Sequence, residues 1–437
     1  MLTSNLQLQL TSDGMISNRR HFMKQIVAGT AGLSALGWLD AVRLEAAQLR
    51  KKGMACILLF QRGAPSQFET FDPKPGTATG GPTQAIKTSV PGIEIAEGWE
   101  KTAKQMKHIS LLRSVFSKEG NHERAVYLLH TSYAPSGSVK HPGMGSVVAS
   151  ELSDTNFDMP HFVSIGGNIS LSPSYLGMTY APFVVQDPNR MPLNVELPGN
   201  VDAARLKRRL ALMDKLSKDF AESGGKIRVD DQQALYKSAA NMVTSPRIKA
   251  FDLSQEKDNI RDQYGRTPFG QGCLLARRLV EVGVTCVEVT HGNWDTHDDN
   301  FNRTKRLAGE NDPAFASLIE DLATRGMLER TLVIWMGAFG RTPTINARTG
   351  RDHYPRAFSI ALAGGGIKGG MVIGNTGKDG RDVGDRPVSV QDLFCTIYET
   401  LNINPRKEHI SAEKRPMKYV DGGQAIKDLL KTATVKG

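Results

Sequence analysis

The sequence predicts an α/β fold with a mostly parallel central sheet and helices on both of its faces. Short β-branched or apolar runs alternate along the chain with helical patterns, a rhythm typical of such sheets. The run 56–60 is hydrophobic at every position, as expected of a strand covered on both faces. The chain has 437 residues, of which 40% are hydrophobic and 23% charged. This composition is ordinary for a globular protein and excludes a disordered tail protein or a fibre.

Six strands and six helices are expected from these patterns. The strands are 54–60, 109–115, 162–165, 284–290, 331–336 and 358–363. The helices are 143–152, 201–220, 232–242, 270–282, 313–325 and 390–401. The helix over 270–282 is followed by Gly283, a good residue for ending a helix, and the next strand begins at once.

A polar segment and a glycine-rich segment interrupt this alternation of strands and helices. Residues 197–260 are rich in Lys, Asp and Gln, which predicts exposed helices that form either an insertion or a lid on a main domain spanning 48–437. The glycine-rich segment 364–370 lies between two apolar runs. It lacks the spacing of a phosphate-binding loop, so we expect a hairpin turn there.

The N-terminus has the pattern of an export signal. Residues 18–24 read Asn-Arg-Arg-His-Phe-Met-Lys and precede an apolar run over 25–39. Paired arginines, a nearby aromatic, a lysine and a modest apolar stretch predict a twin-arginine export signal over 1–47, and hence a periplasmic or cell-envelope location. Two alternatives stay open. One is an amphipathic first helix, and the other is an uncleaved anchor, because Glu45 stands where a cleavage site takes a small residue.

The charge distribution argues against a nucleic-acid partner. The formal net charge is +10, and residues 1–52 hold seven Lys/Arg against three Asp/Glu. The remaining excess is spread without a basic block or interleaved aromatics, so no nucleic-acid binding is expected. A mildly basic surface favours anionic ligands. Beyond the N-terminal segment, no stretch approaches the ~20 apolar residues of a membrane span.

The four cysteines are far apart and show no C-x-x-C spacing. We expect them to be small buried hydrophobic residues, with a disulfide or metal role as the alternative.

Polar side chains collect after three of the expected strands, over 61–73, 291–300 and 337–343. Ligands of open α/β sheets bind beyond the carboxyl ends of the strands. Asp295 and His297 lie two residues apart in one such loop, and His353 with Asp352 follows another. A mixed N/O ligand set suits Zn or Mn and predicts a metal site here. The alternative is that Asp295 caps the following helix and His297 hydrogen-bonds to it.

Further residues suit chemistry on an anionic ester. Arg341 or Arg351 can hold an oxyanion, because a guanidinium matches sulfate and phosphate geometry. In a second polar cluster, His122 and Glu123 can do acid–base work. Close by, Thr131 or Ser132 can serve as a nucleophile. The alternative for this cluster is an ordinary helix with polar contacts at both ends.

At these residues the chain resembles the exported family known as domain of unknown function 1501. The shared motifs are R-R-x-F at 19–22, G-x-P-S-Q-x-x-T-F-D-P-K-P at 63–75, Asn-His at 121–122, W-D-T-H at 294–297, F-G-R-T-P at 339–343, G-R-D-H at 350–353 and A-G-G-G-I-K-G-G at 363–370. That family is similar to the sulfatase and alkaline-phosphatase superfamily. The resemblance therefore implies an alkaline-phosphatase-like fold with metal ligands on the loops after the central strands.

The resemblance also implies a ligand set. Asp295, His297 and His353 match ligand positions, and Glu69 stands where the family usually has Asp. Two departures occur: the family's G-E-F-G-R-T-P has Ala338 in place of its glutamate, and residues 61–64 differ from the usual H-G-G loop. Losing a carboxylate leaves a two-metal site short of a ligand, so the remaining set implies either one ion or a metal-free site.

These observations predict metal-assisted hydrolysis of a sulfate or phosphate ester. A divalent metal ion (Zn, Mn, Ca or Mg) would activate water. Arg341 would hold the ester oxyanion, and His122 would orient water or the leaving group. The substrate would be an anionic ester such as a sulfated or phosphorylated glycan. Two alternatives remain: a non-catalytic member that binds an anionic glycan or a cell-envelope partner, and a structural envelope protein held by an uncleaved signal anchor.

Overall fold

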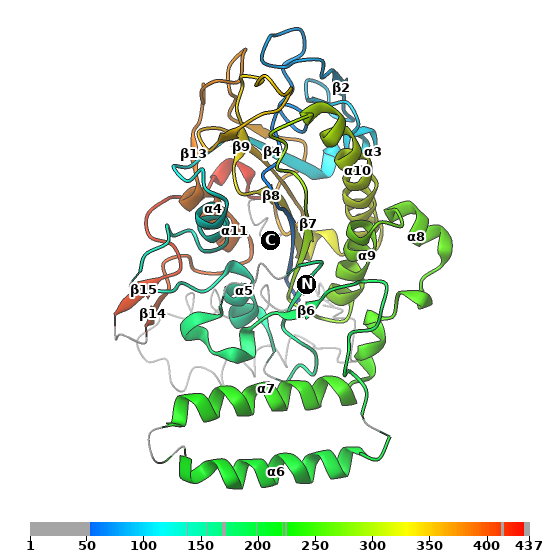
Figure 1. The fold of residues 1–437 in the computed structure, drawn as a ribbon, viewed down its shortest axis with the longest axis vertical. Coiled ribbons are helices and arrows are strands. Elements are labelled where there is room, and N and C mark those ends of the chain that lie inside the picture. Colours follow the sequence, from blue (N-terminus) through cyan, green and yellow to red (C-terminus); the bar gives the residue numbers. More distant parts are fainter. Residues whose placement is uncertain are drawn as a thin grey trace, which may run out of the picture. The chain divides into compact units, whose positions relative to one another are not determined.

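The computed structural model describes residues 53–431, except 138, 155, 168–171, 198, 221, 223–224 and 412–414 (Figure 1). These residues belong to one compact unit that begins at Gly53. The predicted export signal over 1–47 lies outside the described residues.

A nine-stranded sheet forms the centre of this unit. Its strands are β1 (Ala55–Gln61), β4 (Ile109–Phe116), β5 (Phe162–Ile165), β6 (Phe183–Val185), β7 (Cys286–His291), β8 (Thr331–Gly337), β11 (Phe358–Ala363), β12 (Val372–Ile373) and β13 (Val388–Ser389). The order is β12-β4-β11-β8-β1-β7-β5-β6, and β13 also pairs with β4. Only β11 is antiparallel to its neighbours among these described strands. The predicted fold class, a mostly parallel α/β sheet, is therefore confirmed.

The helices and the smaller strands surround this sheet. The α-helices are α3 (Glu100–Lys104), α4 (His122–Thr131), α5 (Met144–Leu152), α6 (Ala203–Phe220), α7 (Lys226–Thr244), α8 (Asp258–Tyr264), α9 (Pro268–Glu281), α10 (Asn300–Thr324) and α11 (Val390–Thr400). Short 3₁₀ turns are η1 (Met106–His108), η2 (Ser174–Leu176), η3 (Met178–Tyr180), η5 (Pro246–Phe251), η6 (Leu253–Gln255), η7 (Leu328–Arg330) and η8 (Lys427–Leu429). Three antiparallel pairs are β2 (Ala85–Lys87) with β3 (Glu94–Ala96), β9 (Gly340–Arg341) with β10 (His353–Tyr354), and β14 (Glu408–Ile410) with β15 (Pro416–Lys418). None of the helices in the described ranges is long and apolar enough to cross a bilayer.

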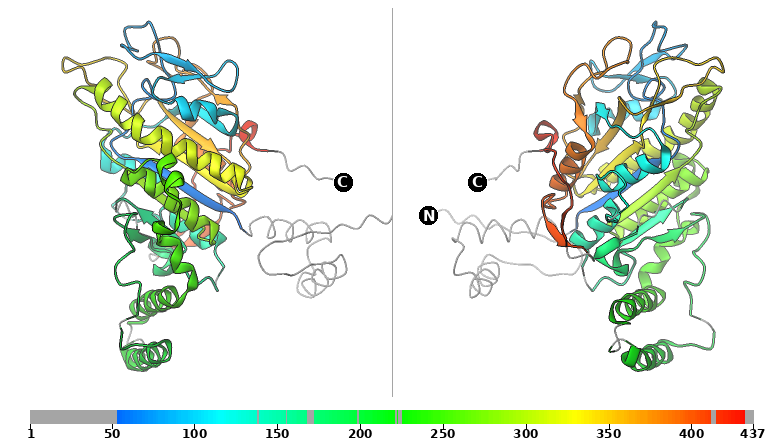
Figure 2. Two further views of the ribbon diagram at one scale, coloured as in Figure 1. Left: turned by 90° about the vertical axis from the view of Figure 1, so that its right-hand side faces the viewer. Right: turned by 60° about the vertical axis from the view of Figure 1, so that its left-hand side comes forward.

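Both faces of the sheet carry a hydrophobic core. Along β1, Ile57 and Leu59 pack into a core with residues of α9 and α10. Leu58 and Phe60 belong to a second core with residues of α4, α5 and α11. Figure 2 shows α9 and α10 together on one side of the sheet. Since neither face meets water, β1 is buried along its whole length, which explains its unbroken hydrophobic sequence.

Three predicted elements differ from the observed ones. Helix α7 begins at Lys226, six positions before the predicted start at 232. Helix α10 begins at Asn300, thirteen positions before the predicted start, and carries Pro313 in its interior. The glycine-rich segment 364–370 does not form a hairpin, because β12 pairs with β4 and β4 lies between β12 and β11. The connection therefore passes over a strand.

The segment predicted as an insertion or lid forms α6 and α7, which pack against each other, and α7 also contacts η3. In Figures 1 and 2 the two helices lie at the end of the unit away from β9. They do not lie over the loops that follow β1, β7 and β8.

Candidate metal centre

Three neighbouring parallel strands end at the same level of the sheet. Gln61, the last residue of β1, pairs in register with His291 of β7 and with Gly337 of β8. The loops that follow these strands therefore meet at one edge, where ligands of such sheets bind. The β9–β10 pair adds His353 opposite Arg341.

Four side chains converge at this edge, and we call them the Asp295 cluster: His122, Asp295, His297 and His353. Ligand atoms of His122, Asp295 and His353 all lie within 4.8 Å of one another. The Nε2 atoms of His297, His353 and His122 lie 3.1, 3.3 and 3.4 Å from carboxylate oxygens of Asp295. These separations match the roughly 3.4 Å between ligands that surround a Zn ion tetrahedrally at about 2.1 Å. The fold thus brings together residues that are distant in sequence.

Hydrogen bonds fix the rings of His297 and His353. The Nδ1 of His297 lies 2.8 Å from Oδ1 of Asp352, and the Nδ1 of His353 lies 2.7 Å from the carbonyl oxygen of Gly120. A carbonyl or carboxylate oxygen accepts, so both Nδ1 atoms carry the proton. The Nε2 atoms of both rings point inward and face each other at 2.9 Å. Two lone pairs at this distance repel unless a cation or a proton lies between them.

The carboxylate of Asp295 is held ionised. Burial favours its neutral form, but the hydrogen bond and the charge of Arg341 outweigh burial and, with His122 and His297, hold the pKa of Asp295 at about 2. The Nη2 of Arg341 lies 2.6 Å from Oδ1 of Asp295. Asp295 does not cap the following helix, whose N-cap is Asp299.

Arg341 has a different role from the predicted grip on an ester oxyanion. Its side chain is completely buried. Besides Asp295, its guanidinium donates to the carbonyl oxygens of Gly63, Ala64, Trp294 and Arg351. With its donors directed to these groups, Arg341 acts as a positioning residue for Asp295.

Gly63 shows how closely the β1 loop approaches Asp295. It has φ +103, and a Cβ placed there would lie 2.5 Å from the backbone nitrogen of Asp295. Only glycine fits this position without displacing Asp295.

An aromatic ring packs against two histidines of the cluster. The Phe339 ring lies 4.9 Å from the ring of His122 and 4.6 Å from that of His353, between centroids. Burial lowers the pKa of His122, although the charge of Asp295 opposes this. His122 is therefore neutral near pH 7. The neighbouring Ala338 is buried in the hydrophobic core of the α4 face.

Glu69 does not join the Asp295 cluster, contrary to the prediction that it is a fourth ligand. Its Oε1 lies 2.8 Å from Nη2 of Arg351 in a buried ion pair. Arg351 also donates to the carbonyl oxygens of Thr79, Thr342 and Pro343. Glu69 and Arg351 therefore join the loops that follow β1 and β9, and Arg351 is not available to a ligand.

A buried network behind Asp295 was not predicted. The indole of Trp294 and the amide of Asn311 both donate to Nδ1 of His291, at 3.0 and 2.8 Å. His291 then donates through Nε2 to Glu310 at 3.0 Å, and burial lowers its pKa. The sequence signal was a histidine at the very end of a strand. The network fixes Trp294, the residue before Asp295.

The second polar cluster splits between two places. His122 lies in the Asp295 cluster, at the first position of α4. Thr131 and Ser132, at the other end, donate to the carbonyl oxygens of Tyr127 and Tyr419. They hold backbone together, which fits the alternative of an ordinary helix with polar end contacts. Among the described residues, no serine, threonine or cysteine side chain hydrogen-bonds to the Asp295 cluster.

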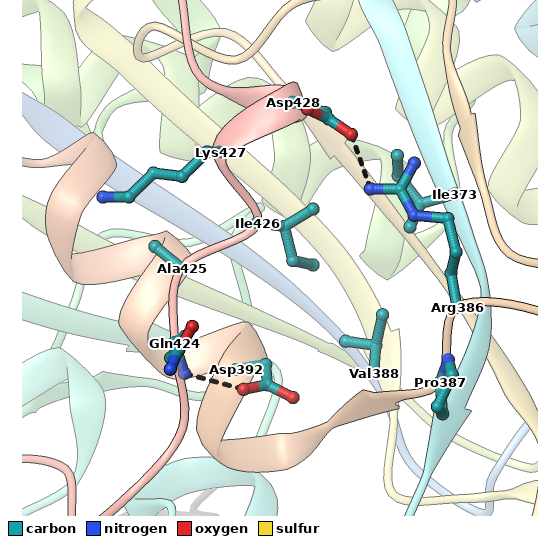
Figure 3. Close-up of a pocket in the computed structure, with 10 residues that line it drawn as sticks. All are labelled: Ile373, Arg386, Pro387, Val388, Asp392, Gln424, Ala425, Ile426, Lys427 and Asp428. Atoms are coloured by element: carbon teal, nitrogen blue, oxygen red, sulfur yellow. Dashed lines mark hydrogen bonds and ion pairs between the residues drawn. The ribbon is translucent and has the colours of Figure 1, made fainter.

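A separate pocket of about 340 Å³ lies beside α11 and contains no member of the Asp295 cluster. It is lined by Ile373, Val388 and Ile426 and by charged side chains, including those that make the contacts marked in Figure 3. Arg386 lies 2.6 Å from Asp428, and Asp392 accepts from the backbone of Gln424 at 2.7 Å. Lys427, also in the lining, pairs with Glu399 outside the pocket.

Comparison with known proteins identifies one family. A family model described as "Protein of unknown function (DUF1501)" matches residues 54–430, which is the resemblance that the motifs suggested. No curated protein sequence matches the chain significantly.

Several solved structures are similar in fold. The PsFucS1 sulfatase from Pseudoalteromonas sp. is 13% identical at a TM-score of 0.38, with 89% of this chain and 72% of that one covered. The lipoteichoic acid synthase LtaP from Listeria monocytogenes is 9% identical at 0.40, with 81% and 73% covered. The alkaline phosphatase from the Antarctic bacterium TAB5 is 13% identical at 0.35, with 80% and 98% covered.

Proposed function

The chain belongs to the family of proteins of unknown function called DUF1501, and on that premise we propose that it is a metal-assisted hydrolase of sulfate or phosphate esters. One observation carries the proposal. The Nε2 atoms of His297 and His353, each oriented by an acceptor on Nδ1, face each other at 2.9 Å beside the ionised Asp295. Two ring nitrogens this close need a cation or a proton between them, and we propose that the cation is a metal ion.

The donor set fits a divalent transition-metal ion. Imidazole nitrogens with one carboxylate suit Zn or Mn, whereas Ca and Mg take mainly oxygen ligands. Asp352 and the Gly120 carbonyl bind the outer nitrogens of the histidines, as the partners of metal-binding histidines usually do. A bound ion would polarise an ester oxygen and lower the pKa of a water molecule.

The chain's own residues would prepare the site as follows. Arg341 holds Asp295 in place, and Asp352 does the same for His297. His122 is neutral near pH 7 because burial lowers its pKa, so its Nε2 can bind an ion or accept a proton from water. Since no described hydroxyl or thiol bonds to the Asp295 cluster, we propose water as the nucleophile. The substrate would be an anionic ester, such as a sulfated or phosphorylated glycan.

Metal titration tests the site directly. The full chain, stripped of metal, is titrated with Zn²⁺ and with Mn²⁺ in a calorimeter. We expect one ion to bind, and Asp295→Asn or His353→Gln to weaken binding at least tenfold, because losing even an outer partner of a ligand costs about 10–100-fold. The control is Asp298→Asn, a neighbouring carboxylate that pairs with Arg303. A wild-type chain that binds neither ion contradicts the proposal.

Turnover is then measured on 4-nitrophenyl phosphate and 4-nitrophenyl sulfate with the bound ion. Hydrolysis that is lost in Asp295→Asn and kept in Asp298→Asn supports the proposal that the protein is a hydrolase. Ion binding without turnover of either ester, or of a sulfated glycan, contradicts it.

A second candidate function is non-catalytic binding of an anionic glycan or a cell-envelope partner. It is favoured by Ala338, which places a methyl group in the core where the family resemblance implies a carboxylate. The variant Ala338→Glu distinguishes the hydrolase function from the binding-only function. A gain of ion binding or turnover supports a decayed enzyme, whereas measurable turnover by the wild-type chain excludes the binding-only function.

A further inference from the structure

Helix α6 (Ala203–Phe220) exposes a basic and apolar face. Its sequence contains six Lys/Arg and two Asp. Two leucines on this helix are unusually exposed, Leu212 at 57% and Leu216 at 74%. Single exposed leucines are ordinary on protein surfaces, but two of them one helical turn apart form a continuous apolar spot.

Packing against α7 does not explain this face. The half-buried residues of α6 are Leu206, Leu210, Met213 and Ser217, which repeat every three to four positions and form the inner stripe. Figures 1 and 2 show α6 as the outermost element at this end of the unit, with α7 between it and the sheet. The leucines at 212 and 216 lie off the inner stripe, so the contact with α7 leaves them in water.

Basic side chains surround the two leucines. Arg205, Arg208 and Arg209 precede Leu212 by one to two turns on the same exposed side, and Lys215 lies next to Leu216. No described carboxylate pairs with Arg208, Arg209 or Lys215. Arg205 donates to the carbonyl oxygen of Asn200, which leaves its charge without a counter-ion. The face is therefore cationic and incompletely neutralised.

We propose that α6 docks the protein on an anionic phospholipid surface, independently of the metal centre. Leu212 and Leu216 enter the headgroup layer, and Arg208, Arg209 and Lys215 contact lipid phosphates. A helix with cations around an apolar strip matches the two layers of such an interface, because apolar side chains leave water while the charges meet phosphate. A purely polyanionic partner would pair the charges but would leave the leucines exposed.

The experiment uses the full chain with a polarity-sensitive thiol dye at Leu216→Cys. The four native cysteines are buried, so the dye labels the new site selectively. The control is the same dye at Ile410→Cys, since Ile410 is 64% exposed on a different element. We expect a blue shift at position 216 on vesicles containing phosphatidylglycerol and none on vesicles of phosphatidylcholine alone.

Charge variants test the lipid contact quantitatively. Each basic residue near an anionic bilayer raises the affinity for the bilayer about fivefold. The double variant Arg208→Gln with Arg209→Gln should therefore bind vesicles about 25-fold more weakly. Lys101→Gln with Lys104→Gln on α3 removes the same charge elsewhere and should leave binding unchanged. The N-terminal segment is present in every variant, so differences between variants report α6.

The following results would overturn the proposal. They are an equal shift at position 410, an equal response to phosphatidylcholine vesicles, and a shift at position 216 produced by DNA but not by anionic vesicles. Equal loss of binding in the α3 control would also overturn it.

Discussion

Two buried arginines, Arg341 and Arg351, hold the loops of the candidate metal centre together. Neither side chain reaches solvent. Each donates to one carboxylate and to several backbone carbonyl oxygens that come from different loops. A guanidinium has five donors in a fixed fork, so it can satisfy several loop carbonyls that would otherwise be buried without partners. At the residue scale, the candidate site is thus fixed by ion pairs behind its candidate ligands.

The Glu69–Arg351 pair gives the first prediction. Glu69→Gln removes the counter-charge of a completely buried arginine, which should lower the free energy of unfolding by about 3 kcal/mol. Because Glu69 lies outside the Asp295 cluster, affinity for Zn²⁺ should change by less than about twofold, far below the 10–100-fold cost of disturbing a ligand. Urea unfolding and calorimetric titration measure the two effects.

The matched control for Glu69→Gln is Glu408→Gln, an exposed carboxylate on β14, which should change neither quantity. If Glu69→Gln abolished ion binding while the chain stayed folded, Glu69 would be a ligand after all.

At the scale of elements, the loops after the strands are packed unevenly. A Cβ at Gly350 would lie 1.9 Å from the carbonyl oxygen of His297, and the atoms in its way are backbone atoms. By contrast, nothing lies within 4 Å of a Cβ placed at Gly292, in the loop that carries Asp295. Two glycines near the same site are therefore under opposite steric constraints.

This contrast gives the second prediction. Gly350→Ala should destabilise the fold by about 1–3 kcal/mol, as overpacking does, and should weaken Zn²⁺ binding because the His297 backbone must move. Gly292→Ala should stay within about 0.5 kcal/mol of the wild type. Thermal unfolding and metal titration compare the two. Equal stability and equal Zn²⁺ affinity of the two variants would show that the backbone around His297 can move without an energetic cost.

The elements differ in how far the sequence could predict them. Strands such as 54–60 were predictable because burial on both faces leaves an unbroken apolar run. The start of α10 was not, since Pro313 resembles a first-turn residue and actually lies inside the helix. The hairpin expected at 364–370 failed because the pairing of β12 with β4 is decided by tertiary contacts.

In the candidate site, too, the features that depend on tertiary contacts could not be predicted from the sequence. The convergence of Asp295, His297 and His353 followed from the position of their loops at strand ends. The roles of Glu69 and Arg341 did not, because a long charged side chain can turn inward to a partner that only the folded chain provides. His291 was missed for the same reason, since its partners Asn311 and Glu310 come from α10.

At the scale of the whole molecule, one charged pair crosses from a helix to the middle of the sheet. His130 of α4 and Glu288 of β7 are both almost completely buried, with Nε2 and Oε1 3.5 Å apart. Burial opposes the charge of His130, but the charge of Glu288 and the Val126 carbonyl outweigh it, so the pKa of His130 is raised. The pair connects the helix that begins at His122 to the strand that leads to Asp295.

The third prediction concerns the pH dependence of stability. Since the folded pKa of His130 exceeds its ordinary value of 6.5, protonated His130 stabilises the fold. The wild type should therefore have a higher free energy of unfolding than His130→Asn. Below pH 6.5 this difference should reach its full value of about 3 kcal/mol. It should shrink as pH rises through the raised pKa. Melting temperatures at about pH 6 and pH 9 measure this gap.

The control is His409→Asn. Burial lowers the pKa of His409, so its gap should have the opposite dependence and decrease as the pH falls. A gap for His130→Asn that stays constant over this range would show that the His130–Glu288 pair is not ionised.

The last prediction concerns where the whole chain works. The candidate ligands His122, Asp295 and His353 come from segments far apart in sequence, so the candidate metal centre exists only after the chain has folded. Export in the folded state would let the ion be loaded beforehand, and we therefore propose that the paired arginines at 19 and 20 direct twin-arginine export.

Lysine lacks the planar guanidinium fork, so Arg19→Lys with Arg20→Lys should move the protein from the periplasmic to the cytoplasmic fraction, measured by immunoblot. Arg43→Lys with Arg50→Lys makes the same change further along the chain and should leave export intact. Equal periplasmic amounts of both variants would refute this route.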